Sequence, residues 1–199
     1  NYFGYRPVFG SNGGETLRVG TSHYSMFDSL TTIDSNYFEN CDGEVEIISI
    51  KSGKNRITNN VFDRSKGTLT LRHGNGNVVE SNVFFGQGVE HTGGIRIINQ
   101  DQVVRNNYLE GLTGYRFGAG FTVMNGVPNS PVNRYMSVKN AQIEHNTFID
   151  LDFIEIGAGA DAERSEAPSD STFRNNFIYN HTAKNLVTVH SDASGIKFA

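Results

Sequence analysis

The chain has 199 residues, 37% hydrophobic and 19% charged, which is enough apolar material for the core of one domain and excludes wholesale disorder. The net charge of −4 excludes a nucleic-acid binder that works by bulk attraction to phosphates. A single cysteine and the lack of a long apolar run exclude an intrachain disulfide and a transmembrane helix.

Short β-prone segments follow one another along the chain, each bounded by Gly, Asn or Asp as strands commonly are. They cover residues 15–19, 44–50, 68–72, 94–98, 121–124, 153–156 and 186–190. No stretch shows apolar residues at helical spacing over three turns, so we expect no long helices.

A repeat runs through the same sequence: asparagine, any residue, then a large apolar residue. The copies begin at Asn1, Asn36, Asn60, Asn82, Asn107, Asn146 and Asn176. A unit of about 22–25 residues, lengthened in places by insertions, explains their spacing. Units this short bury a core only by stacking.

The repeat therefore predicts an all-β fold, a parallel β-helix that forms a single domain over residues 1–199 with about seven or eight coils. The recurring asparagine is expected at a bend, where its amide can bond the equivalent residue one coil away. A β-sandwich would instead need regular hairpins. The longer intervals place insertions within 111–140 and 161–170. We expect the first on the binding face, and the second, which is highly charged, as a solvated excursion.

Three cations lie about one repeat apart: Lys51, Arg72 and Arg96. Coil stacking would bring them together as a column on one face, which a structural surface would avoid because like charges repel. The alternative is three solvated cations that do not meet.

Acidic residues lie beside this column. Glu44 and Glu46 are two residues apart in one expected strand and so point to the same face. The turn containing Asn12 would lie one coil away. Two carboxylates and an amide oxygen suit Ca²⁺; the alternative is a solvated polar strand face.

Several motifs, agreeing in order and spacing, resemble polysaccharide lyase family 6, which includes alginate lyases and chondroitinase B. They are residues 12–20 (NGGETLRVG), 44–52 (EVEIISIKS), 69–76 (LTLRHGNG), 93–98 (GGIRII) and 125–135 (NGVPNSPVNRY). The first and last look like the alginate-lyase branch. The resemblance implies a right-handed parallel β-helix.

By motif, the resemblance places the Brønsted base at Lys51, the acid at Arg72, and substrate contacts at His73 and Arg96. It places the Ca²⁺ ligands at Asn12, Glu44 and Glu46. Family members carry further coils before this segment. We therefore expect that the N-terminal coils and cap are missing, and that this chain is a segment of a longer rod or that another chain or segment completes the rod.

The expected activity is cleavage of alginate by β-elimination in a secreted or periplasmic enzyme, with neither nucleic acid nor membrane as a partner. Because the net charge cannot steer a polyanion, local cations such as Arg116 are further candidates for substrate binding. A dermatan sulfate lyase, a hydrolase with paired carboxylates and a non-catalytic carbohydrate-binding β-helix remain as alternatives.

Overall fold

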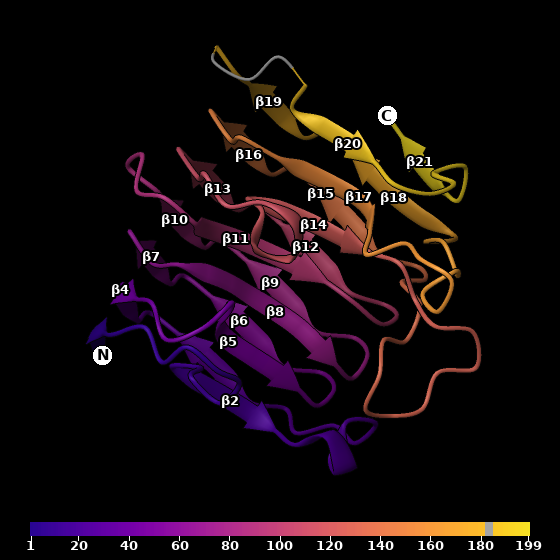
Figure 1. Ribbon diagram of the computed structural model, residues 1–199, viewed down its shortest axis with the longest axis horizontal. Coiled ribbons are helices and arrows are strands. Elements are labelled where there is room, and N and C mark those ends of the chain that lie inside the picture. Colours follow the sequence, from indigo (N-terminus) through magenta and orange to yellow (C-terminus); the bar gives the residue numbers. More distant parts are fainter. Residues whose placement is uncertain (182–184) are drawn as a thin grey trace.

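The computed structural model describes residues 1–181 and 185–199, and these form three parallel sheets of seven strands each. Every strand pairs in parallel with the strands one coil before and after it, so the chain winds as a parallel β-helix (Figure 1). The predicted fold class is confirmed.

The first sheet carries the asparagine repeat. Its strands are β1 (Tyr2–Arg6), β4 (Tyr37–Cys41), β7 (Val61–Asp63), β10 (Val83–Phe85), β13 (Tyr108–Glu110), β16 (Thr147–Ile149) and β19 (Phe177–Tyr179). Each strand begins directly after one of the seven repeated asparagines. The amide nitrogen of each asparagine donates to the amide oxygen of the next, at 2.9–3.1 Å. The predicted amide ladder is therefore present along all seven coils.

This ladder makes a prediction about stability. Asn82 is fully buried, and its amide oxygen accepts both the side-chain and the backbone N–H of Asn60. Asn82→Ala leaves those donors buried and unpaired, so the free energy of unfolding should fall by about 2–3 kcal/mol. Denaturant titration measures the loss, with the exposed Asn133→Ala as control. Equal stability of the two variants would contradict a stabilising role for the ladder.

The second sheet, here called the site sheet, contains all seven β-prone segments. Its strands are β2 (Leu17–Gly20), β5 (Glu46–Lys51), β8 (Gly67–His73), β11 (Thr92–Ile97), β14 (Phe121–Met124), β17 (Ile154–Ala158) and β20 (Val187–Val189). One strand boundary differs from the sequence-based expectation at a candidate site residue: Glu44 precedes β5 instead of lying within it. There the backbone of Glu44 and Val45 passes so close to Gly67 that a Cβ at that glycine would clash.

The third sheet was not evident from the sequence. Its strands are β3 (Thr32–Asp34), β6 (Arg56–Thr58), β9 (Val78–Glu80), β12 (Val103–Arg105), β15 (Gln142–Glu144), β18 (Ser171–Arg174) and β21 (Ile196–Phe198). Most have only three residues with one buried side chain in the middle, which is too short for alternation to appear.

Apolar side chains from the three sheets fill the inside of the coil. Phe38, Phe62 and Phe84 stack on successive turns, with ring centroids 4.8 and 4.4 Å apart. Such offset pairs add to the free energy gained by burial. The helical elements of the described ranges are two short 3₁₀ turns, η1 (Ser22–Tyr24) and η2 (Arg116–Gly118), and neither could cross a bilayer.

The two insertions contact each other. The backbones of Gly126 and Glu166 exchange two hydrogen bonds, at 2.8 and 3.0 Å, and Arg134 forms an ion pair with Glu163. The loop 161–170 is largely exposed, as expected for a solvated excursion, but it also holds the segment around Arg134 beside the site sheet.

Candidate active site

A cavity of about 470 Å³ lies over the site sheet and is here called the site cavity. Seven of the eight residues singled out in the sequence line it: Asn12, Glu44, Glu46, Lys51, Arg72, His73 and Arg96. They come from the turn before β2 and from β5, β8 and β11, so coil stacking brings together residues far apart in the chain.

The three cations share this cavity without forming a strict column. Lys51 lies opposite His73 in the register of β5 and β8, whereas Arg96 lies opposite Thr70. The register between β5 and β8 shifts just before Lys51. The lysine and the arginines therefore approach the cavity from different points along their strands.

Two of these three cations have acidic side chains as partners. Lys51 Nζ lies 3.4 Å from a carboxylate oxygen of Glu15, and the Lys51 side chain is only 14% exposed. Arg96 is buried and forms an ion pair with Glu46. These pairs hold the amine and the guanidinium in place.

Arg72 is held differently, without a carboxylate partner among the described residues. Its Nη1 donates to the carbonyl oxygen of Arg134 at 2.6 Å and lies 3.0 Å from His73 Nε2. The guanidinium lies over the Tyr135 ring, 4.2 Å from its centroid. Burial lowers the pKa of Arg72, against opposing effects of Tyr135 and Glu46. Arg72 is thus a partly desolvated cation aimed into the cavity.

His73 is buried beside Arg72. Since a guanidinium only donates, His73 Nε2 accepts this hydrogen bond and the imidazole is neutral. Burial, with repulsion from Arg72 and Lys51, lowers the pKa of His73 from 6.5 to about 4. Its Nδ1 has no hydrogen-bond partner in the described ranges, which leaves one polar atom for a ligand.

The lowered pKa of His73 predicts a pH dependence of stability. The unfolded chain takes up this proton near pH 6.5 and the folded chain only near pH 4. The unfolded state therefore binds more protons between these values, and the free energy of unfolding should fall as the pH falls from 6.5 to 4. Denaturant titrations across this range should show a smaller fall for His73→Gln. The exposed His23→Gln should behave as the wild type, and an unchanged slope for His73→Gln would contradict the expectation.

Three carboxylates meet at the site cavity: Glu44 and Glu46 line it, and Glu15 contacts Lys51. Oxygen atoms of Glu15, Glu44 and Glu46 lie within 4.8 Å of one another. Burial, with repulsion from Glu15 and Glu46, raises the pKa of Glu44 to about 7. Asn12 lines the same cavity. Clustered carboxylates that repel one another, together with an amide oxygen, form a donor set of the kind that hard divalent cations prefer, so this cluster could hold a metal.

Some residues of the cavity were not singled out from the sequence. Glu15 lies in the turn that begins at Asn12, and its position one coil before Glu46 was the signal that could have found it. Phe117 and Tyr135 come from the first insertion, and each lies against an arginine of the site: Phe117 under Arg96 and Tyr135 under Arg72. Insertion loops carry no repeat from which their position could be predicted.

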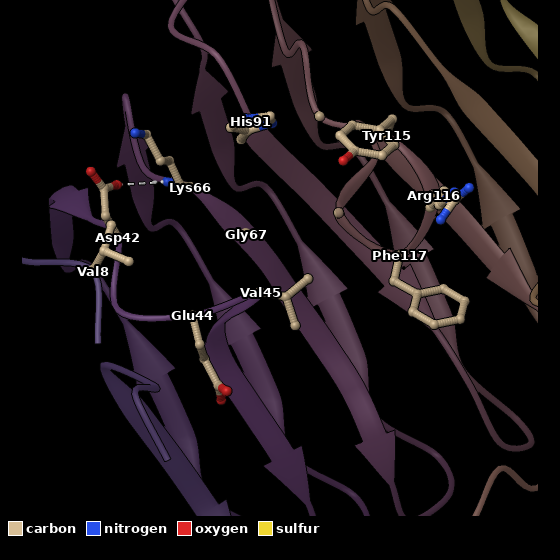
Figure 2. Close-up of a pocket in the computed structure, with 12 residues that line it drawn as sticks. Val8, Asp42, Glu44, Val45, Lys66, Gly67, His91, Tyr115, Arg116 and Phe117 are labelled. Atoms are coloured by element: carbon tan, nitrogen blue, oxygen red, sulfur yellow. Dashed lines mark hydrogen bonds between the residues drawn. The ribbon is translucent and has the colours of Figure 1, made fainter. Parts of the chain in front are cut away.

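Arg116, the eighth residue singled out, does not line the site cavity. It lines a second hollow of about 460 Å³ that shares Glu44, Val45 and Phe117 with the first (Figure 2). The two hollows are therefore neighbours with a common wall.

The chain is similar in sequence and fold to several proteins of known structure. The PL6 family alginate lyase AlyGC is 66% identical, with a TM-score of 0.98, and the match covers 100% of this chain and 27% of that chain. A mannuronic acid specific polysaccharide family 6 lyase from human gut microbiota is 31% identical, with a TM-score of 0.81, and 51% of it is covered. Alginate lyase AlyF-OU02, solved with G6, is 29% identical, with a TM-score of 0.86 and 49% covered.

In both of these last matches the whole of this chain is aligned. The chain thus spans between about a quarter and about half of the length of these solved proteins. Comparison with curated proteins gives no match. The family model described as chondroitinase B matches residues 1–199. With the parallel β-helix and its coil-built cavity, this match shows that the chain belongs to the chondroitinase B family.

Proposed function

We propose that the protein cleaves alginate by β-elimination and leaves an unsaturated uronate at the new chain end. The observation that carries this proposal is the site cavity, which is lined by Lys51, by Arg72 and by two of the three clustered carboxylates, Glu44 and Glu46. The 66% identity to an alginate lyase supports alginate as the substrate.

The reaction breaks two bonds of the polymer. Lys51 acts in its neutral form, after its ammonium has lost a proton: the amine accepts the proton from C5, the C5–H electrons form a double bond between C4 and C5, and the C4–O4 bond breaks. The departing O4 is a basic alkoxide, and a charge-assisted hydrogen bond from Arg72 stabilises it until it is protonated. Burial of Arg72 strengthens this bond, because less water competes for the guanidinium.

The residues around this pair orient the sugar. His73 and Tyr135 fix the Arg72 guanidinium, and Arg96 offers a second guanidinium along the cavity. His73 Nδ1 and Arg96 Nε have no hydrogen-bond partner among the described residues. Both groups therefore have capacity left to bind the uronate.

We propose Ca²⁺ as the cation, with Asn12, Glu44 and Glu46 as ligands and Glu15 as a fourth. When bound, it would neutralise the substrate carboxylate and so acidify C5–H. Because such a polymer is met outside the cell, we also propose that the protein is secreted or periplasmic.

The experiment that tests the proposal measures ultraviolet absorbance of the unsaturated product on alginate and on dermatan sulfate. The family description, chondroitinase B, makes dermatan sulfate the second candidate. We expect the signal on alginate. A signal on dermatan sulfate alone would transfer the same mechanism to that polymer. Binding of alginate without any absorbance change would favour the non-catalytic alternative, and shortened chains without unsaturation would indicate a hydrolase.

A further inference from the structure

The second hollow lies beside the site cavity at the other end of the same strands. Its walls come from the segments that lead into β5, β8 and β11 and from the loop before β14, whereas Lys51, Arg72 and His73 lie at the carboxyl ends of β5 and β8. Its lining residues are Val8, Asp42, Glu44, Val45, Lys66, Gly67, His91 and residues 114–118. A polymer lying along the strand direction would pass from one hollow into the other over Glu44, Val45 and Phe117.

Arg116 differs from every other arginine of the chain. The other ten each have a carboxylate or a backbone carbonyl within reach of the guanidinium, such as Arg72 with the Arg134 carbonyl and Arg96 with Glu46. Within residues 1–181 and 185–199, no acid or carbonyl meets the side chain of Arg116. Its charge is therefore available to a ligand.

The backbone of Arg116 is nevertheless firmly held. Its φ of 53° lies in the left-handed region, which is unfavourable for arginine. The backbone N–H donates to buried Glu155 at 3.2 Å, and the carbonyl accepts from the Thr122 hydroxyl at 3.2 Å. Glu155 is itself paired with His190. The fold thus stabilises a strained residue that places one unpaired guanidinium at the rim of the hollow.

The other walls carry charges of both signs and an apolar ring, with the carboxylates of Asp42 and Glu44 in the lining beside Lys66. Lys66 stands on the opposite side from Arg116 (Figure 2), and no carboxylate pairs with its ammonium in the described part of the chain. The Asp42 carboxylate accepts the backbone N–H of Lys66 at 2.9 Å. The Tyr115 ring, 52% exposed, offers an apolar face, and its centroid lies 5.9 Å from that of His91.

From these observations we propose that the second hollow binds a uronate of the same polymer, next to the uronate that lies in the site cavity. Arg116 takes the carboxylate, Lys66 adds charge from the facing side, and Tyr115 packs against the sugar ring. This inference rests on the proposed function. Its consequence is that cleavage should improve with substrate length until the second hollow is filled.

The test uses Arg116→Asn in the full chain, because asparagine tolerates the left-handed backbone while losing the cation. Steady-state kinetics on a series of alginate oligomers give kcat/KM as a function of length. The increase in kcat/KM from the shortest to the longest oligomer should be roughly tenfold smaller in the variant than in the wild type. The difference should lie mainly in KM, as expected for the loss of one charge-assisted contact. Arg116→Lys should restore part of the gain.

Two controls separate binding from folding. Arg56→Asn removes the same charge from β6 on the third sheet and should keep the wild-type length dependence. Thermal unfolding of Arg116→Asn should match that of the wild type. If Arg116→Asn left the length dependence of kcat/KM unchanged, or lowered kcat/KM equally at all lengths, uronate binding in the second hollow would be contradicted. The proposed lyase activity would not be affected. Failure of the wild type to cleave any oligomer would overturn the proposed function, and this inference with it.

Discussion

Lys51→Ala should reduce turnover of alginate by about 10³-fold while oligomer affinity stays within a few-fold of the wild type. Lys51 and Arg72 both line the site cavity, and the Lys51 amine, once deprotonated, is the group proposed to accept the C5 proton. No other lysine of residues 1–181 and 185–199 lines this cavity. Removing the base affects the chemical step, whereas Arg72, Arg96 and His73 continue to bind the uronate.

Two measurements decide this prediction: the initial rate of absorbance increase and calorimetric binding of an alginate oligomer. The matched control is Lys54→Ala, because Lys54 lies on the same coil but pairs with Asp28 at 2.7 Å outside the cavity. Retained turnover in Lys51→Ala would remove the lysine from the mechanism. Loss of binding together with turnover would make it a binding residue.

The second large effect is expected from the carboxylate cluster. Chelation should lower activity by roughly 10²-fold or more, and added Ca²⁺ should restore it, because the elimination passes through concentrated negative charge next to the substrate carboxylate. Glu15→Gln should weaken Ca²⁺ binding and require a higher Ca²⁺ concentration for the same rate. Glu15 is 4% exposed at its side chain and belongs to the cluster with Glu44 and Glu46.

Calcium titrations of activity and of binding heat test this prediction, with Glu110→Gln as the control because Glu110 lies on the first sheet, away from the cluster. Full activity after chelation would show that Lys51 and the arginines suffice without a metal. A Glu15→Gln variant with the wild-type calcium requirement would remove Glu15 from the ligand set and leave the sequence-based set of Asn12, Glu44 and Glu46.

The fold was largely predictable because one residue type, asparagine, recurs at one position in every coil. Each repeated asparagine has to sit at the same bend, since its amide bonds the next copy, and this fixes the coil spacing. Once the coils are stacked, Lys51, Arg72 and Arg96 are expected on neighbouring strands, and the cavity contains all three.

The remaining features depend on interactions that have no period. The register shift before Lys51 places it opposite His73, and such a shift cannot be counted from the sequence. Tyr135 lies against Arg72 in an insertion that the Gly126–Glu166 hydrogen bonds join to the second insertion, and no repeat in the sequence predicts these contacts. Glu15 begins the β-prone segment 15–19 in the sequence but precedes β2, which begins at Leu17, so its place beside Glu46 was not singled out.

The separate origins of the cavity walls have a consequence for how members of this family diversify. The amine and the guanidinium of the proposed reaction centre lie on hydrogen-bonded coils, whereas Tyr135 and Asn133 come from the insertion between β14 and β15. Under the proposed function, exchanging residues 125–140 together with 161–170 between relatives would therefore change only the loop side of the cavity. The elimination chemistry would stay with the recipient scaffold.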